Sequence, residues 1–179
     1  ISLAASYFLK KQGIVSVVGD DFPQDMIGTF RKRGVDLAGL EVMPGKESFF
    51  WSGRYHYDMN ARDTLETRLN VLLDLDPQLN EAYRSAEYLM LGNLDPVIQA
   101  KVLDQVEAPA LVAMDTMNFW MDSAMEKLKE VIARVDILVI NDSEVRQLSG
   151  EHSLVKAAHH VLAMGPKYLV VKKGEHGAL

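Results

Sequence analysis

The sequence predicts an α/β fold in which a mainly parallel sheet is covered by helices on both faces. Short apolar runs of strand length alternate with segments whose apolar residues recur at helical spacing. Repeated strand–helix units of this kind make successive strands parallel and join them by right-handed crossovers. One segment breaks the pattern: residues 47–72 contain apolar and polar residues in alternation, which predicts a small antiparallel hairpin.

Composition narrows the class of protein. A chain of 179 residues with 48% hydrophobic residues suits one ordinary globular domain. The net charge is −6 and basic residues form no stripe, which argues against a nucleic-acid-binding surface. No apolar run approaches the roughly 20 residues of a membrane span. The absence of cysteine removes disulfides and cysteine zinc sites and fits a reducing cytosol, so we expect a cytoplasmic protein.

The N-terminal elements follow from periodicity. A helix, a buried strand and a short amphipathic helix are expected at residues 1–12, 14–18 and 24–33. Gly13 and Gly34 end the two helices, as glycine commonly does. The strand ends in the polar turn Gly19-Asp20-Asp21, which therefore lies at a carboxyl end of the predicted sheet.

The predicted hairpin has one aromatic face. Its first strand carries this face on alternate residues, at Phe49, Trp51, Tyr55 and Tyr57. A turn is expected at residues 58–63, and a second alternating strand then runs to Val71. Because the hairpin interrupts an α/β chain, we expect it to stand off the sheet as a lid or dimer surface; the alternative is an edge hairpin of the core. An exposed aromatic surface is usually covered by a partner, which predicts a homodimer through the lid.

The C-terminal half returns to strand–helix alternation. Strands are expected at residues 88–91, 110–114, 137–140 and 168–171, each near a segment of helical pattern. Asp95 followed by Pro96 predicts a capped helix start. Ser123 and Glu126 have the spacing of a capping box, which predicts another helix start.

Polar or glycine residues follow five of the predicted strands. They are Gly19-Asp20, Gly92-Asn93, Asp115, Asn141 and Lys172-Lys173-Gly174. Parallel sheets bind ligands beyond the carboxyl ends of their strands, so a site is expected there.

Asn141 and Glu144 stand where a strand leads into a helix. A helix N-terminus presents N–H groups and partial positive charge, which suits an anion. The same three-residue spacing is also that of a capping box, with Asn141 as the N-cap and Glu144 at the third helical position. Spacing alone leaves both interpretations open.

Several enzyme classes lack support. No Walker A motif, no Gly-x-Ser-x-Gly elbow and no Gly-x-Gly-x-x-Gly turn after the first strand is present. These absences argue against a P-loop kinase, an α/β-hydrolase and a dinucleotide-binding oxidoreductase. The pair Gly174 and Gly177 after the last strand would let the backbone approach a phosphate or nucleobase.

The ordered motifs together resemble the ribokinase-like (PfkB-type) carbohydrate kinases. The matching segments are residues 18–22, residues 33–36, the aromatic hairpin, residues 139–144 with the Asn-x-x-Glu pattern, and residues 171–178 with Lys-Lys-Gly-Glu-His-Gly. The resemblance covers essentially the whole chain. It implies a ribokinase-like core at residues 1–46 and 73–179 and a β lid at residues 47–72.

The resemblance implies transfer of the ATP γ-phosphoryl group to a sugar hydroxyl. Asn141 and Glu144 would organise the phosphates and Mg²⁺, with Glu144 acting on the metal through water. Lys172, Gly174 and Gly177 would line the nucleotide side, with Lys173 as a further candidate. The candidates for the sugar side are Asp20, Asn93, Asn118 and Arg54. Asn118 falls one place later than the Asp-x-Asn pattern of the family, counted from Asp115.

The resemblance also implies segments outside this sequence. A Gly-Gly-x-x-x-Asn sugar-binding segment would precede Ile1, and the segment with the catalytic-base Asp would follow Leu179. We therefore expect no catalytic residue within the chain, no turnover by this chain alone, and a full enzyme of which the sequence omits parts. The alternatives are a nucleoside or vitamin kinase of the same superfamily, or a non-catalytic nucleotide- or sugar-binding domain.

Overall fold

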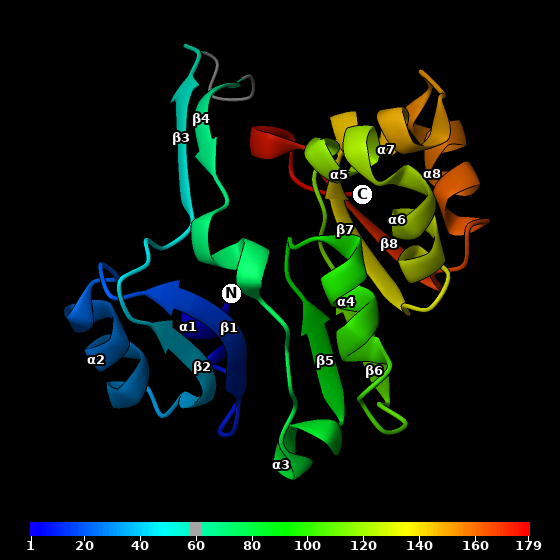
Figure 1. The fold of residues 1–179 in the computed structure, drawn as a ribbon. Coiled ribbons are helices and arrows are strands. Elements are labelled where there is room, and N and C mark those ends of the chain that lie inside the picture. The colour runs from blue at the N-terminus through cyan, green and yellow to red at the C-terminus, as the bar shows by residue number, and fades with distance from the viewer. Residues whose placement is uncertain (58–61) are drawn as a thin grey trace. The chain divides into compact units, whose positions relative to one another are not determined.

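The computed structural model describes residues 1–57 and 62–179 and divides the chain into two compact units, residues 1–83 and 84–179 (Figure 1). The elements of the first unit are α1 (Ser2–Ala5), β1 (Gly13–Gly19), α2 (Gln24–Lys32), β2 (Asp36–Met43), β3 (Phe50–Tyr55), β4 (Arg62–Arg68) and the 3₁₀ helix η1 (Asn70–Asp74). Helix α3 (Glu81–Arg84) lies where the units join along the chain. Within the described residues, no helix is long and apolar enough to cross a membrane.

The first unit is built on the parallel pair β1–β2. Its buried side chains include Val17, Ile27, Val35 and Val71. The predicted long helix over residues 1–12 is wrong, since only Ser2–Ala5 is helical. Helices depend on packing of an apolar face, and beyond Ala5 the large side chains Tyr7, Phe8 and Leu9 stay exposed.

Strand β2 was not predicted from the sequence. Gly39 interrupts its apolar pattern, and Glu41 lies among its exposed residues. Gly39 is explained by the structure, because a Cβ there would lie 2.7 Å from the Tyr83 ring. The backbone pairing with β1 therefore forms where side-chain alternation is weak.

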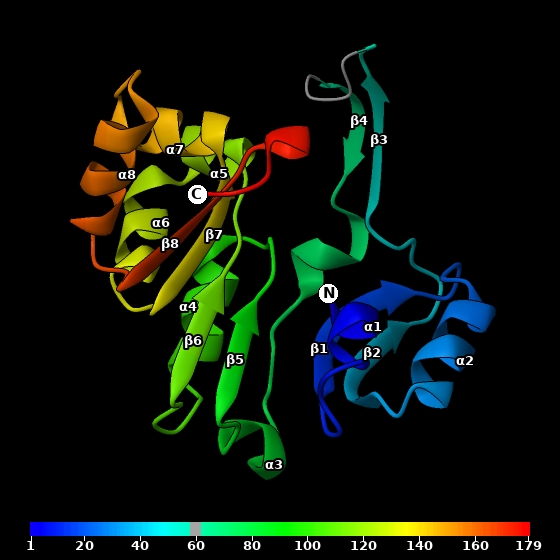
Figure 2. The same ribbon diagram turned by 180° about the vertical axis from the view of Figure 1, so that it is seen from behind.

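Strands β3 and β4 form the predicted antiparallel hairpin, which extends away from β1–β2 within this unit (Figures 1 and 2). Ser52 pairs with Glu66 and Gly53 with Thr64, so Leu65 forms a bulge. The turn predicted at residues 58–63 falls largely on residues 58–61, which lie outside the described residues.

The second hairpin strand ends at Arg68, so its predicted extension to Val71 is wrong. Asn70 adopts a positive φ of 46° and begins η1. Val71 is fully buried, and its N–H donates to the Glu47 carbonyl at 3.2 Å. Burial of Val71 in the unit core outweighs continuation of the strand.

The end of β1 anchors the base of the hairpin. The Gly19 N–H donates to Ser48 Oγ at 2.9 Å, and Asp21 Oδ1 accepts from Ser48 N at 2.8 Å and Ser48 Oγ at 2.7 Å. These hydrogen bonds from Ser48 lower the pKa of Asp21. A Cβ on Gly19 would lie 2.1 Å from the Lys46 carbonyl oxygen, so glycine is required for this close approach.

The second unit holds a four-stranded parallel sheet in the order β5-β6-β7-β8. Its elements are β5 (Tyr88–Leu91), α4 (Pro96–Leu103), β6 (Leu111–Met114), α5 (Asn118–Ser123), α6 (Met125–Ile132), β7 (Ile137–Asn141), α7 (Asp142–Ser149), α8 (Leu154–Leu162), β8 (Tyr168–Lys172) and the 3₁₀ helix η2 (Gly174–His176). This confirms the predicted parallel strand–helix alternation. All four carboxyl ends lie at one edge.

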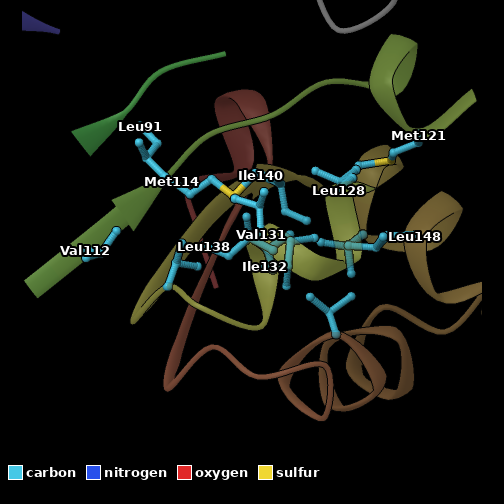
Figure 3. Packing of buried hydrophobic residues seen from close by; sticks show 14 of the residues in the cluster. Leu91, Val112, Met114, Met121, Leu128, Val131, Ile132, Leu138, Ile140 and Leu148 are labelled. Carbon is cyan, nitrogen blue, oxygen red and sulfur yellow. The ribbon is translucent and has the colours of Figure 1, made fainter. Parts of the chain in front are cut away.

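The core of this unit lies between the sheet and its helices (Figure 3). Met114, Leu138 and Ile140 project from β6 and β7 and are fully buried against Leu128 and Ile132 of α6. The helices of this unit pack on one face of its four-stranded sheet (Figures 1 and 2), as part of the predicted α/β fold of a mainly parallel sheet covered by helices. On the opposite face lie exposed apolar side chains, at Tyr88, Met90, Tyr168 and Val170.

The two predicted helix starts have different outcomes. The Asp95 cap is confirmed, because Asp95 Oδ1 accepts from Val97 N at 2.8 Å and Pro96 occupies the first turn. The Ser123 capping box is wrong: Ser123 ends α5, and its Oγ donates to the Phe119 carbonyl at 2.6 Å. The chain breaks at Ala124 into two helices instead of beginning one.

Asp136 extends the ladder between β6 and β7 at the amino edge of the sheet. Its Oδ2 accepts from the Val112 N–H at 2.9 Å, and its Oδ1 pairs with Lys167 Nζ at 2.7 Å. The hydrogen bond from Lys167, followed by that from Val112, lowers the pKa of Asp136. The Asp136 carboxylate thus provides the hydrogen-bond acceptor for the N–H of the buried residue Val112.

Asp136→Ala should lower the free energy of unfolding by about 1–3 kcal/mol, because the Val112 N–H loses its acceptor inside the fold. Urea denaturation at pH 7 measures this loss. The control Lys167→Met removes only a partner whose side chain is 73% exposed, so its effect on stability should be clearly smaller than that of Asp136→Ala. Equal losses of unfolding free energy in the two variants would contradict the role of Asp136 as the acceptor for the Val112 N–H.

The same pair predicts a pH dependence. The folded pKa of Asp136 lies below its usual value of about 3.9. Its ionised form therefore stabilises the fold above about pH 4, and this contribution is lost as the pH falls through the folded pKa. Asp136→Asn keeps a carbonyl oxygen for Val112 but loses the charge, so its stability should approach that of the wild type in acid.

Candidate functional site

The carboxyl edge of the four-stranded sheet gathers four of the predicted polar positions. Asn93, Asp115, Asn141 and Lys172 lie at or just after the ends of β5, β6, β7 and β8, in that order. Neighbouring strands are about 4.8 Å apart, and Asn141 and Lys172 are register partners. Gly19-Asp20 ends β1 of the separate β1–β2 sheet, so this edge holds four of the five expected strand ends.

Asn141 and Glu144 form a complete capping box at the start of α7. Asn141 Oδ1 accepts from the Glu144 N–H at 2.8 Å, and Glu144 Oε2 accepts from the Asn141 N–H at 2.7 Å. Ser143 Oγ donates to the same Asn141 oxygen at 2.7 Å. The capping interpretation is thereby confirmed. It places these residues at the centre of the polar edge, where a second role remains a prediction.

Glu144 fits an indirect role at a metal. Its side chain is buried, with 3% of the residue exposed, and one carboxylate oxygen is held by the cap. Within residues 1–57 and 62–179, no three His, Asp or Glu side chains are grouped so as to hold a metal ion. Mg²⁺ commonly binds one or two carboxylates and takes its other ligands from phosphates and water. Glu144 suits that arrangement through a metal-bound water.

Lys172 reaches across the end of β7 toward β6. Its Nζ lies 3.6 Å from Asp115 Oδ1, and the two side chains are 48% and 26% exposed. An exposed pair at this distance contributes little stability. The ammonium group is therefore available to an anion at the edge, in keeping with its predicted place on the nucleotide side.

The loop after β8 explains its two glycines. Gly174 and Gly177 both have positive φ, of 58° and 78°. The loop closes through a bond from Lys173 N to the Gly177 carbonyl at 2.8 Å, and Lys172 then pairs with Ala178. The space where a Cβ of Gly177 would lie holds no described atom within 4 Å. The glycines are required by the turn, and the open surroundings of Gly177 are compatible with close approach of a ligand.

Asn93 and Asn118 are held by different neighbours. Asn93 Oδ1 accepts from Trp120 Nε1 at 2.9 Å, and its amide group contacts Met117 Sδ at 3.0 Å. The Asn118 amide instead donates to Gln147 on α7. Asn93 is therefore bound to Trp120 of α5 at the carboxyl end of the sheet. Asn118 is bound to Gln147 of α7 instead.

Asp20 and Arg54 belong to the first unit. Asp20 Oδ2 accepts from the Gly45 N–H at 2.8 Å, so it supports the turn after β2. Arg54 is exposed on β3 and is paired in register with Asp63. The sugar-side roles of both residues remain predictions.

The sequence analysis missed two buried polar residues near this edge. Gln99 on α4 is 2% exposed, and Thr116 after β6 is 3% exposed. Gln99 had a detectable signal, since it occupies a helix face shared with the buried residues Pro96 and Ala100. Thr116 had none, because a threonine next to Asp115 is common in loops.

Comparison with known families decides the relationship. The chain matches the pfkB family of carbohydrate kinases over residues 1–179. The chain belongs to this family. The resemblance inferred from the ordered motifs is confirmed, and with it the ribokinase-like α/β fold.

Three relatives illustrate the family. The cytidine kinase of Thermococcus kodakarensis is 24% identical over 182 residues, covering 100% of this chain and 64% of its own. Ribokinase of Arabidopsis thaliana, solved with ribose and ATP, has a TM-score of 0.74 at 16% identity, covering 99% of this chain and 60% of its own. A candidate ribokinase II of E. coli, solved with ATP and Mg²⁺, has a TM-score of 0.68 at 22% identity, covering 93% and 57%. The chain thus spans about three fifths of the length of these pfkB relatives.

The capping box can be tested separately from any chemistry. Asn141→Ala should lower the free energy of unfolding by about 1 kcal/mol, since the Glu144 N–H loses its acceptor. Glu144→Gln should cost less, because a glutamine oxygen also serves in capping boxes. Asn141→Asp is the matched control and should resemble the wild type. Thermal unfolding measures all three; a loss for Glu144→Gln as large as that for Asn141→Ala would contradict this geometry.

Proposed function

We propose that this chain is the larger part of an ATP-dependent kinase that transfers the γ-phosphoryl group to a hydroxyl of a small carbohydrate. The observation that carries the proposal is the α7 N-terminus, with Asn141 and Glu144, standing between Asp115 and Lys172 in a pfkB-family chain. A helix N-terminus beside a lysine is suited to bind phosphate groups.

Each residue then has a distinct task. The N–H groups at the start of α7 and the Lys172 ammonium would bind phosphate oxygens. Gly174 and Gly177 would let the loop after β8 approach the nucleotide, with Lys173 beside them. Glu144 would orient a metal-bound water, and Mg²⁺ would neutralise phosphate charge. Catalysis of phosphoryl transfer rests mainly on such positioning and charge stabilisation.

The acceptor would lie on the side of β5 and β6. Asn93 and Asp115 represent this side in the second unit, and Asp20, Asn118 and Arg54 are further candidates. The full enzyme would supply the catalytic base from outside residues 1–179. A nucleoside kinase is the second candidate function, favoured by the similarity to a cytidine kinase. A non-catalytic nucleotide- or sugar-binding domain is the third, and turnover distinguishes it.

We further propose that residues 47–72 form a lid on a core of residues 1–46 and 73–179, in a cytoplasmic enzyme. The hairpin carries aromatic side chains of the predicted face with large exposed fractions: Phe49 at 44%, Tyr55 at 52% and Tyr57 at 105%. A second copy of the chain would cover them, giving a homodimer through the lids.

The full-length protein should consume ATP with Mg²⁺ in the presence of one class of acceptor, measured across a panel of sugars and nucleosides. Glu144→Gln should lower turnover by about 100-fold or more, since it removes a charge at the phosphates but preserves the cap. The control Glu130→Gln changes an exposed carboxylate that pairs with Lys127 on α6, and should leave turnover unchanged. ATP binding without turnover on any acceptor would favour the non-catalytic alternative.

The lid interface predicts a dimer in sedimentation at micromolar concentration. Tyr55→Glu should dissociate it, because a charge would be buried in an apolar interface. Leu73→Glu is the control, since Leu73 is 75% exposed on η1, outside the hairpin. A monomeric wild type, or equal dissociation by both variants, would rule out the lid as the interface.

A further inference from the structure

Gln99 is an uncharged polar side chain at a core position of the second unit. It is 2% exposed on α4, beside the buried residues Pro96 and Ala100. The Asp95 cap fixes the start of this helix directly after β5. Burying an amide is costly unless it is hydrogen-bonded, so its presence calls for a specific role.

The Gln99 amide ties two neighbouring strand ends together. Its Nε2 donates to the Gly92 carbonyl at 2.8 Å and to the Asp115 carbonyl at 3.2 Å. Gly92 follows β5 and Asp115 follows β6, where the backbone ladder finishes with the bond from Asp115 N to Leu91 O at 2.9 Å. Gln99 therefore continues the connection beyond the ladder and fixes the spacing of the two ends.

The tied residues carry the acceptor side of the edge. Asn93 follows Gly92 directly, and its side chain is oriented by Trp120 Nε1 at 2.9 Å. The Asp115 carboxylate lies 3.6 Å from Lys172 Nζ and accepts from Thr116 N at 2.9 Å. A change in the spacing of the two strand ends would move both polar side chains relative to each other.

If Gln99 served only to connect the two strand ends, its side-chain oxygen would also be expected to have a hydrogen-bond partner. Instead, Gln99 Oε1 and Thr116 Oγ1 are buried and have no hydrogen-bond partner among the described residues. Most buried polar groups in proteins are paired with protein or water, so a buried atom without a protein partner calls for an explanation such as bound water or a ligand. Gln99 Oε1 and Thr116 Oγ1 therefore leave hydrogen-bonding capacity beside the ends of β5 and β6, which bound water or a ligand can satisfy.

We propose that Gln99 is a positioning residue for the acceptor. It holds Asn93 and Asp115 at the separation needed to bind a polyhydroxylated acceptor, which is a carbohydrate or the ribosyl group of a nucleoside. The inference rests on the proposed kinase function and extends it to a residue that touches neither substrate. The proposed site then has two parts. Gln99 supports the acceptor side at the ends of β5 and β6, and the nucleotide side lies at the ends of β7 and β8.

Steady-state kinetics of the full-length protein tests this inference. Gln99→Met keeps a similar volume but removes both hydrogen bonds, so KM for the acceptor should rise by about tenfold or more while KM for ATP stays within about twofold. The matched control is Gln105→Met, which changes a partly exposed glutamine whose amide donates to the Lys101 carbonyl one helical turn earlier. Its kinetic constants should equal those of the wild type.

Gln99→Asn provides a second variant if the Met variant fails to fold. Its shorter amide keeps a donor but reaches one carbonyl at most, so the acceptor KM should still rise without a change in KM for ATP. A rise confined to the acceptor supports the inference. An unchanged acceptor KM in a folded variant, or equal rises in both KM values, overturns it and leaves the kinase function standing. Absence of transfer by the wild type overturns the proposed function itself, and this inference with it.

Discussion

The candidate site depends on the register of β5 to β8. Alternate residues of β6 and β7 bury Val112, Met114, Leu138 and Ile140 against the helices. A slip of one residue would move these side chains to the other face of the sheet. The same alternation aligns the strand ends, so hydrophobic burial fixes where Asp115, Asn141 and Lys172 stand relative to one another. The polar edge is thus positioned by the apolar core beneath it.

Most of the fold was predictable because its signals are local. Apolar runs and helical spacing identified all four strands of the second unit, and the hairpin was found from its period of two. The failures share a cause in contacts that are distant in sequence. Val71 leaves its strand and is fully buried in the first unit, and residues 6–12 lack the packing that a helix needs. Periodicity cannot report either condition.

In the candidate site, too, contacts between residues close in sequence were predictable and contacts between distant residues were not. The capping box at Asn141 was visible from spacing, since its partners are three residues apart. Gln99 contacts Gly92 and Asp115, the latter 16 residues away, and Trp120 contacts Asn93 across 27 residues. Such pairs become neighbours only once the sheet has formed. The polar residues after the predicted strands located the site from the sequence, whereas the hydrogen bonds that organise it came from the structure.

The two interpretations of Asn141 and Glu144 are compatible because they use different groups of one helix end. The cap satisfies the Glu144 N–H, and helix geometry leaves the other first-turn N–H groups without intrahelical acceptors. Acidic residues there would repel phosphate, but Asp142 is paired with Arg146 at 2.7 Å. The remaining negative charge is Glu144, which is buried and bound to the Asn141 N–H. If phosphate binds at this helix end as proposed, a cation between it and this carboxylate would offset their repulsion, which is the role proposed for Mg²⁺.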